Sequence, residues 1–237
     1  SVNFTDATHN KGVAIIDSYL SSLYSIERSL TLSASVTFEQ SYGSHEGDSA
    51  SCALLIAMLS AVTGLPIPQS YAVTGTLDQF GFVRPIGGAN VKVEGFFDVC
   101  KARGLDGTHG VIIPATNIEN LMLREDVVEA VRDGSFKVIA VEHVDDLIEL
   151  MFGMPAGARG ADGKFPAGTL HARVEAILRE MDEKLEDRRK SDKDRDRQES
   201  AHPSQPEPEM PPPPEPPPDP GPLTTPTQAM PPGSTDD

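Results

Sequence analysis

The stretch Glu46-Gly47-Asp48-Ser49-Ala50-Ser51 places a serine where a glycine-containing loop runs into a long apolar segment. Residues 50–63 carry mostly apolar and small side chains, which predicts a buried helix. Gly47 can adopt backbone angles that are closed to other residues. Ser49 is then expected at the helix N-terminus, where free N–H groups and the helix dipole stabilise an oxyanion. That geometry suits a nucleophilic serine; the competing interpretation is that Asp48 or Ser49 only caps the helix.

Around this stretch, apolar patterns with a helical period alternate with patterns typical of strands. Helices are expected at 11–24, 50–63, 90–103, 117–119, 124–134 and 144–152, and strands at 30–39, 70–74, 83–86, 110–113 and 136–141. Gly64 and Pro66 are expected to end the second helix through a left-handed cap and a missing N–H. The pattern predicts an α/β (α+β mixed) fold in which short sheets pack against helices around one core.

A second group of residues follows in a fixed order. Thr74-Gly75 opens a segment that continues through Gly81 and Pro85 to Ile86-Gly87-Gly88-Ala89-Asn90-Val91-Lys92. Together with the residues around Ser49, this order resembles the proteolytic domain of the Lon protease family, and in particular LonB-like members with a G-D-S-A-S nucleophile motif. The resemblance covers roughly residues 10–152.

The resemblance implies that Ser49 is the nucleophile and Lys92 the general base of a Ser-Lys dyad. An ordinary lysine has a pKa near ~10.4, so the site must lower this value by desolvation before the amine accepts a proton. Apolar neighbours in the sequence are expected to surround Lys92 and supply that desolvation: Val91, Val93, Phe96 and Phe97. Without the motif, Lys92 would be interpreted as a solvated lysine on a helix.

Four further roles follow from the same resemblance. Thr74 is expected to orient the lysine. The alternative interpretation is that Thr74 is a simple hydroxyl at the end of a strand. Glu46 occupies the acidic position before the nucleophile and either holds the loop or tunes Lys92. Because an ion pair would favour the charged lysine, this carboxylate is expected to turn away in the active form. The backbone N–H groups of Ser49 and Asp48 are the candidates for the oxyanion hole. The strand at 30–39 is the candidate for pairing with an extended peptide substrate.

No rival site is expected among the other residues. The histidines are scattered, and none has the i, i+4 spacing of a helical zinc pair: His9, His45, His109, His143, His171 and His202. His45 precedes Ser49 closely and is interpreted as a rim residue. The chain has no phosphate-loop motif, because Gly87-Gly88 lacks the adjoining Lys-Ser/Thr. We therefore expect no metal and no cofactor in this chain, and rank a phosphotransferase last.

The composition restricts which partners the chain is expected to bind and in which cellular compartment it is expected. The net charge of −16 disfavours DNA phosphates and anionic lipid as partners. Cys52 and Cys100 fall within predicted helices and are expected to be small buried hydrophobes, with no disulfide framework. No signal peptide or membrane span is encoded, which predicts a cytoplasmic protein. The chain starts at Ser1 within a loop, which is typical of an N-terminally truncated fragment or an excised domain.

The composition changes after Phe152, so we predict a proteolytic domain at 1–152 and three further segments. Residues 153–169 are a Gly/Ala-rich connector, and 170–199 a charged, helical segment. A narrow apolar stripe runs along this segment: Val174, Ile177, Leu178, Met181 and Leu185. We favour a solvated helix over one that docks or self-associates. Residues 200–237 are an acidic, proline-rich tail that is expected to be disordered.

The resemblance thus implies an ATP-dependent serine endopeptidase that hydrolyses unfolded or damaged polypeptide through an acyl-enzyme, in protein quality control. It also implies an AAA+ ATPase module, which would bind ATP and Mg²⁺ outside this chain, and a homohexamer, although the isolated domain can remain a monomer. The alternative is a non-catalytic peptide-binding module on the same fold. The presence of Ser49, Lys92 and Thr74 together argues against that alternative.

Overall fold

The structure is a computed structural model that describes residues 7–25, 32, 34–36 and 47–200, with side chains placed for 11–25, 32, 34–36 and 47–193. The described residues up to Asp192 belong to one compact unit, and those from Lys193 onward to a second. No helix in these described ranges is long and apolar enough to cross a membrane.

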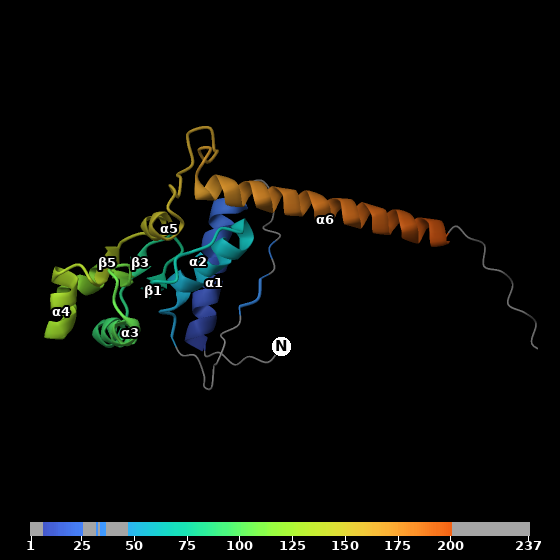
Figure 1. Ribbon diagram of the computed structural model, residues 1–237. Helices are drawn as coiled ribbons and strands as arrows, with labels where there is room; N and C mark the ends of the chain where they lie inside the picture. Colours follow the sequence, from blue (N-terminus) through green and yellow to red (C-terminus); the bar gives the residue numbers. More distant parts are fainter. Residues whose placement is uncertain (1–6, 26–31, 33, 37–46, 201–237) are drawn as a thin grey trace, which may run out of the picture. The chain divides into compact units, whose positions relative to one another are not determined.

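Helices and short strands alternate along the first unit (Figure 1). The helices are α1 (Ala7–Tyr24), α2 (Ser51–Thr63), α3 (Ala89–Arg103), the 3-10 helix η1 (Ala115–Asn120), α4 (Glu125–Arg132), α5 (Val144–Phe152) and α6 (Leu170–Ser200). The strands are β1 (Tyr71–Val73), β2 (Thr76–Leu77), β3 (Val83–Arg84), β4 (Gly110–Pro114) and β5 (Lys137–Val141). The predicted helices are confirmed, with a 3-10 helix at 117–119, whereas β2 was not predicted.

A parallel sheet with the strand order β1-β4-β5 forms the centre of the domain. Val73 pairs with Ile112, and Ile112 in turn pairs with Ile139. Every residue of β4 is buried, as expected for the middle strand of a parallel sheet that is covered on both faces. β2 and β3 form a separate antiparallel pair. The mixed α/β fold with small sheets is therefore confirmed.

The helices cover the two faces of the parallel sheet as separate layers. Ile112 points into a core cluster with α1, α2, α5 and the start of α6. Its neighbours Val111 and Ile113 point into a second cluster with α3 and α4. This alternation follows from the two-residue period of a strand. The fold therefore places α2 and α3, which carry the two glycine motifs at their N-terminal ends, on opposite faces of one sheet.

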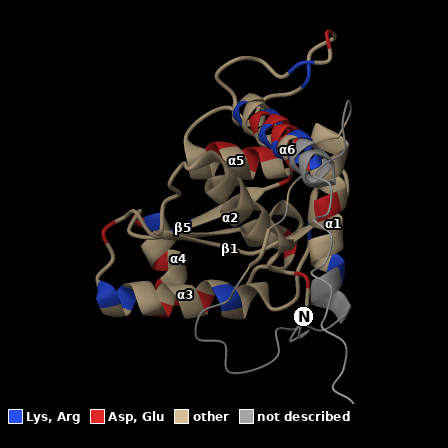
Figure 2. Ribbon diagram, turned by 90° about the vertical axis from the view of Figure 1, so that its right-hand side faces the viewer, with Lys and Arg blue, Asp and Glu red and all other residues tan. Residues whose placement is uncertain are grey.

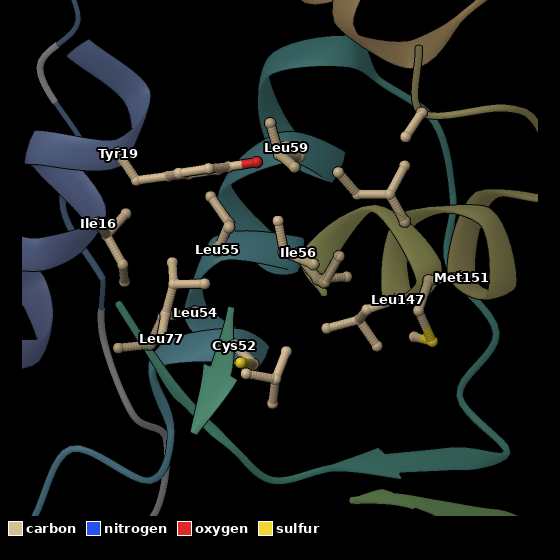
Figure 3. Packing of buried hydrophobic residues seen from close by; sticks show 14 of the residues in the cluster. Ile16, Tyr19, Cys52, Leu54, Leu55, Ile56, Leu59, Leu77, Leu147 and Met151 are labelled. Carbon is tan, nitrogen blue, oxygen red and sulfur yellow. The ribbon is translucent and has the colours of Figure 1, made fainter. Parts of the chain in front are cut away.

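The apolar run at 50–63 forms the centre of the larger cluster. Leu55 and Ile56 are 0% and 1% exposed. Figure 3 shows α2 between α1, which contributes Tyr19, and α5, which contributes Leu147. Full burial of one such aliphatic side chain contributes about 1.5–3 kcal/mol. As predicted, α2 ends at Gly64, whose φ is 67° and whose N–H donates to the carbonyl of Ser60.

The predicted strand at 30–39 lies mostly outside the described residues. Its described part, Leu32 and residues 34–36, has no regular secondary structure. The proline-rich residues 201–237 are also outside the described part of the chain.

The start of the C-terminal helix docks on the core, so the interpretation of this helix as fully solvated is wrong for its first turns. Leu170 and Val174 are 0% and 2% exposed, and Leu178 packs against the same cluster. The connector also contributes Ala156, so the core extends beyond the boundary predicted at Phe152. Further along α6, basic and acidic side chains alternate (Figure 2). The first turns of α6 therefore dock on the core, whereas its later turns are solvated.

Candidate active site

Ser49 lies in a tight turn directly before α2. Gly47 adopts the left-handed conformation that the sequence predicts, with a φ of 84°. The helix starts at Ser51, one residue later than predicted, so Ser49 lies two residues before it. No side chain of the described residues caps this terminus, and the hydroxyl of Ser51 instead donates to the carbonyl of Asp48 at 2.5 Å. Ser49 is therefore no helix cap, and its hydroxyl is left for other contacts.

The backbone of the turn is held by the end of β1. The N–H of Gly75 donates to the carbonyl of Ser49 at 2.9 Å, and the N–H of Cys52 donates to the carbonyl of Gly75 at 3.2 Å. This approach leaves no room for a side chain at residue 75, because an added Cβ would lie 2.8 Å from a methyl carbon of Val83. The glycine of the Thr-Gly motif thus permits contact between strand and turn.

Two further contacts fix the same turn. The carboxylate of Asp48 accepts a hydrogen bond of 3.0 Å from the hydroxyl of Thr76 in β2. On the other side, a Cβ at Gly12 of α1 would lie 2.7 Å from the hydroxyl oxygen of Ser51. Sequence reasoning missed Thr76 and Gly12, because neither contact has a local signal in the sequence. The turn is therefore held by three separate elements.

Lys92 reaches this turn from the first turn of α3. Its Nζ donates to Ser49 Oγ at 2.9 Å and to Thr74 Oγ1 at 3.4 Å. The hydroxyl of Thr74 in turn donates to the carbonyl of Ser49 at 3.3 Å. The structure thus brings together three of the predicted site residues from three different elements. Glu46 and His45 lie outside the described residues.

Partial burial of the amine lowers the pKa of Lys92 below its ordinary value. The apolar neighbours in sequence do not surround it: Val91 is 74% exposed, and Val93 and Phe97 are buried in the core beneath α3. That prediction is wrong because consecutive residues of a helix point in different directions. The amine lies instead against the hydroxyls of Ser49 and Thr74.

The N–H groups of Asp48 and Ser49 donate no hydrogen bond to another described residue. Their carbonyls are both occupied, by Ser51 and by Gly75. Within the described part of the chain, the two donors are thus without an acceptor. Their part in an oxyanion hole remains a prediction.

A second polar cluster joins α1, α5 and α6. His171 accepts or donates hydrogen bonds at 2.6 Å to the hydroxyl of Tyr24 and at 3.3 Å to the carboxylate of Asp145. It is only 2% exposed, so no polypeptide can reach it. We interpret this cluster as structural, since it satisfies buried polar groups where α6 docks. Among the described residues, no group of three or more His, Cys, Asp or Glu side chains is arranged to hold a metal ion.

Comparison with known proteins agrees with the geometry. The family model of the Lon protease (S16) C-terminal proteolytic domain matches residues 33–154, about half of the chain. Lon protease homologs of Haemophilus influenzae and Escherichia coli are 48% and 46% identical over 61% and 62% of the chain. The archaeal Lon protease of Archaeoglobus fulgidus is 35% identical over 48% of the chain. The chain matches only 24%, 25% and 16% of the lengths of these three relatives.

The matched region contains the Ser49 turn, the Thr74-Gly75 pair and Lys92. It ends close to the end of α5. The chain therefore belongs to the family of the Lon protease (S16) C-terminal proteolytic domain.

Proposed function

We propose that this chain is the proteolytic domain of a Lon-type serine protease and hydrolyses peptide bonds of unfolded or damaged polypeptide. The observation that carries the proposal is the 2.9 Å separation between Lys92 Nζ and Ser49 Oγ. This is hydrogen-bond distance, within which a neutral amine can take the proton of a hydroxyl. Membership of the family supports the assignment.

In the proposed reaction, neutral Lys92 takes the proton of Ser49 as Oγ bonds to the carbonyl carbon of the peptide. The N–H groups of Ser49 and Asp48 stabilise the oxyanion of the tetrahedral intermediate. The C–N bond then breaks, and Lys92 gives its proton to the leaving amine. Water hydrolyses the acyl-enzyme by the same route: Lys92 takes a proton from water as its oxygen attacks the ester, and Ser49 recovers a proton as the ester C–O bond breaks.

Thr74 has a positioning role in this mechanism. Its hydroxyl accepts from Lys92 and donates to the carbonyl of Ser49, so it fixes the amine relative to the turn. Glu46, by its place three residues before the nucleophile, is proposed to hold the loop or to tune Lys92.

The domain is proposed to act within a longer protein, because it matches about a quarter of the length of its bacterial relatives. In that protein, an AAA+ module would bind ATP and Mg²⁺, unfold the substrate and deliver it to Ser49. We propose a homohexameric, cytoplasmic assembly that binds neither nucleic acid nor membrane. The net charge of −16 supports the latter point. This domain itself is proposed to need no cofactor.

The test is covalent labelling with a peptidyl phosphonate that reacts with nucleophilic serines, read by intact mass. Wild type is expected to gain one adduct, and Ser49→Ala and Lys92→Ala none. Cys52 does not compete for the probe, because burial raises the pKa of its thiol to about 12. Absence of both labelling and peptide hydrolysis by the folded full-length protein would refute the proposal and favour the peptide-binding module.

A further inference from the structure

The helix that carries Lys92 packs on the sheet through Val93 and Phe97, and residues 115–126 add a row of polar contacts to it. On the side of α3 the contacts are made by the backbone of Ile86, which precedes the helix, and by four side chains within it: Asn90, Glu94, Asp98 and Lys101. The spacing of the first three of these side chains places them in a row along one face of the helix. The segment therefore contacts α3 along its length and also reaches the residue that leads into it.

Asn117 makes the first of these contacts from a buried position. Its side-chain oxygen accepts from the N–H of Ile86 at 3.0 Å, and its amide nitrogen donates to the carbonyl of Ile86 at 3.0 Å. The side chain is 9% exposed. One side-chain amide thus satisfies both backbone groups of Ile86, which belong to the two peptide groups on either side of its Cα, and fixes the backbone of this residue.

The later contacts are at the surface. The side chain of Asn90 accepts from the N–H of Met122 at 3.0 Å, and that of Glu94 accepts from the N–H of Arg124 at 2.9 Å. The Arg124 guanidinium contacts Asp98 at 2.6 and 3.0 Å. Exposed ion pairs contribute little to stability, so the buried contact of Asn117 is the one expected to matter most.

Two glycines, Gly87 and Gly88, connect Ile86 to α3. Among the described residues, no atom lies within 4 Å of the position that a Cβ would take at either glycine. Gly88 has a φ of 67° and immediately precedes the helix. Two glycines impose little restraint on backbone angles. The contact of Asn117 with Ile86, together with that of Asn90 with Met122, therefore holds the start of α3.

We propose that Asn117 is a positioning residue for the reaction: by clamping Ile86 it sets the start of α3 and so the distance between Lys92 Nζ and Ser49 Oγ. The proposal rests on the proposed roles of Ser49 and Lys92. Asn117 lies 25 residues beyond Lys92 in the sequence and touches neither reacting group. Its effect is indirect, since proton transfer between Ser49 and Lys92 requires close alignment.

The experiment compares Asn117→Leu, which removes both hydrogen bonds at similar volume, with Asn117→Asp, which keeps the acceptor. Peptide hydrolysis by the full-length protein is measured across pH. For Asn117→Leu we expect kcat to fall about 10- to 100-fold with KM within about threefold, because substrate contacts are unchanged. Lys101→Gln is the matched control, since it removes an exposed pair with Asp126 from the far end of the same helix. It is expected to keep kcat within about twofold.

For Asn117→Asp, the ratio of its kcat to that of wild type is expected to rise as the pH falls. A protonated carboxyl regains a donor for the carbonyl of Ile86, whereas the ionised form repels it. A folded Asn117→Leu with wild-type kcat, or an Asp variant with a pH-independent ratio, would overturn the proposal.

A readout independent of activity separates this proposal from the proposed function. Nuclear magnetic resonance of ¹³C-labelled lysine side chains gives the pKa of Lys92 directly. In Asn117→Leu this pKa is expected to move up toward the ordinary value, because the amine leaves the Ser49 turn. An unchanged pKa in the folded variant contradicts the clamp, whatever the activity. If the pKa of Lys92 differs between wild type and Asn117→Leu as expected but wild type has no activity, only the proposed function is contradicted.

Discussion

Gly75 and Ser49 share a backbone hydrogen bond of 2.9 Å, from the N–H of Gly75 to the carbonyl of Ser49. The next residues continue the contact, because Cys52 donates to the carbonyl of Gly75. Through this pair the Ser49 turn is joined to β1 and so to the parallel sheet. The position of the Ser49 hydroxyl is thus set by the core of the domain.

Substitution of Gly75 by alanine is expected to strain this junction. The new methyl group would lie 2.8 Å from Val83 and 3.1 Å from the sulfur of Cys52, both buried. Overpacking of this kind lowers the free energy of unfolding by about 1–3 kcal/mol. Urea denaturation measures the effect. Gly95→Ala is the control, because a Cβ there meets no atom of the described residues within 4 Å and alanine favours the helix. An unchanged unfolding free energy for Gly75→Ala would contradict the close approach.

Thr74→Val is expected to slow serine labelling about tenfold, because the loss of one oriented hydrogen bond raises the activation free energy by about 1–1.5 kcal/mol. Valine keeps the shape but removes the hydroxyl that joins Lys92 to the carbonyl of Ser49. Thr74→Ser retains this hydroxyl and is expected to label within about threefold of wild type. Equal labelling rates for Val and Ser variants would show that the hydroxyl has no positioning role.

The labelling rate of wild type is expected to rise with pH and level off. Burial disfavours the ammonium form, so the pKa of Lys92 is lowered, and the neutral amine forms at a lower pH than in a free lysine. The midpoint should therefore lie below the ordinary value of ~10.4. Lys92→Arg stays protonated throughout and is expected to lose at least about 100-fold in rate. A midpoint at or above the ordinary value would be inconsistent with a desolvated base.

The pair of His171 and Tyr24 is expected to couple α6 to α1 energetically. His171→Leu leaves the half-buried hydroxyl of Tyr24 without its 2.6 Å partner, which costs about 1–3 kcal/mol of unfolding free energy. In the double variant with Tyr24→Phe, part of that loss is expected to disappear, since neither polar group remains. A double-mutant cycle from denaturation curves measures this coupling. Strictly additive losses would rule out a direct interaction.

The docked part of α6 is expected to be required for a stable domain. A chain that ends after Met154 loses Leu170 and Val174 from the core, at about 1.5–3 kcal/mol for each side chain. A chain that ends after Asp192 keeps every side chain of that core cluster and serves as the control. Calorimetry of the two truncated chains is the measurement. Similar melting temperatures would show that the helix is dispensable, as its charged sequence suggested.

Local patterns were sufficient for most of the secondary structure. The apolar run after Ala50 and the glycine at 64 predicted the extent of α2, and β-branched residues predicted β4 as a strand. β2 was missed because two residues carry no detectable period. The docking of α6 was missed because a stripe as narrow as Val174 and Leu178 does not reveal whether a core lies opposite it.

The sequence by itself named the residues of the candidate site, because Ser49, Thr74 and Lys92 stand in a recognisable order within two glycine motifs. Only the tertiary structure decided how these residues meet. The turn, the end of β1 and α3 are distant in the chain and converge through Gly75, Asp48 and Asn117. Such contacts depend on backbone approach and on amide geometry across the fold. They leave no periodic pattern in the sequence. For this physical reason the sequence named the residues of the candidate site but could not give their geometry.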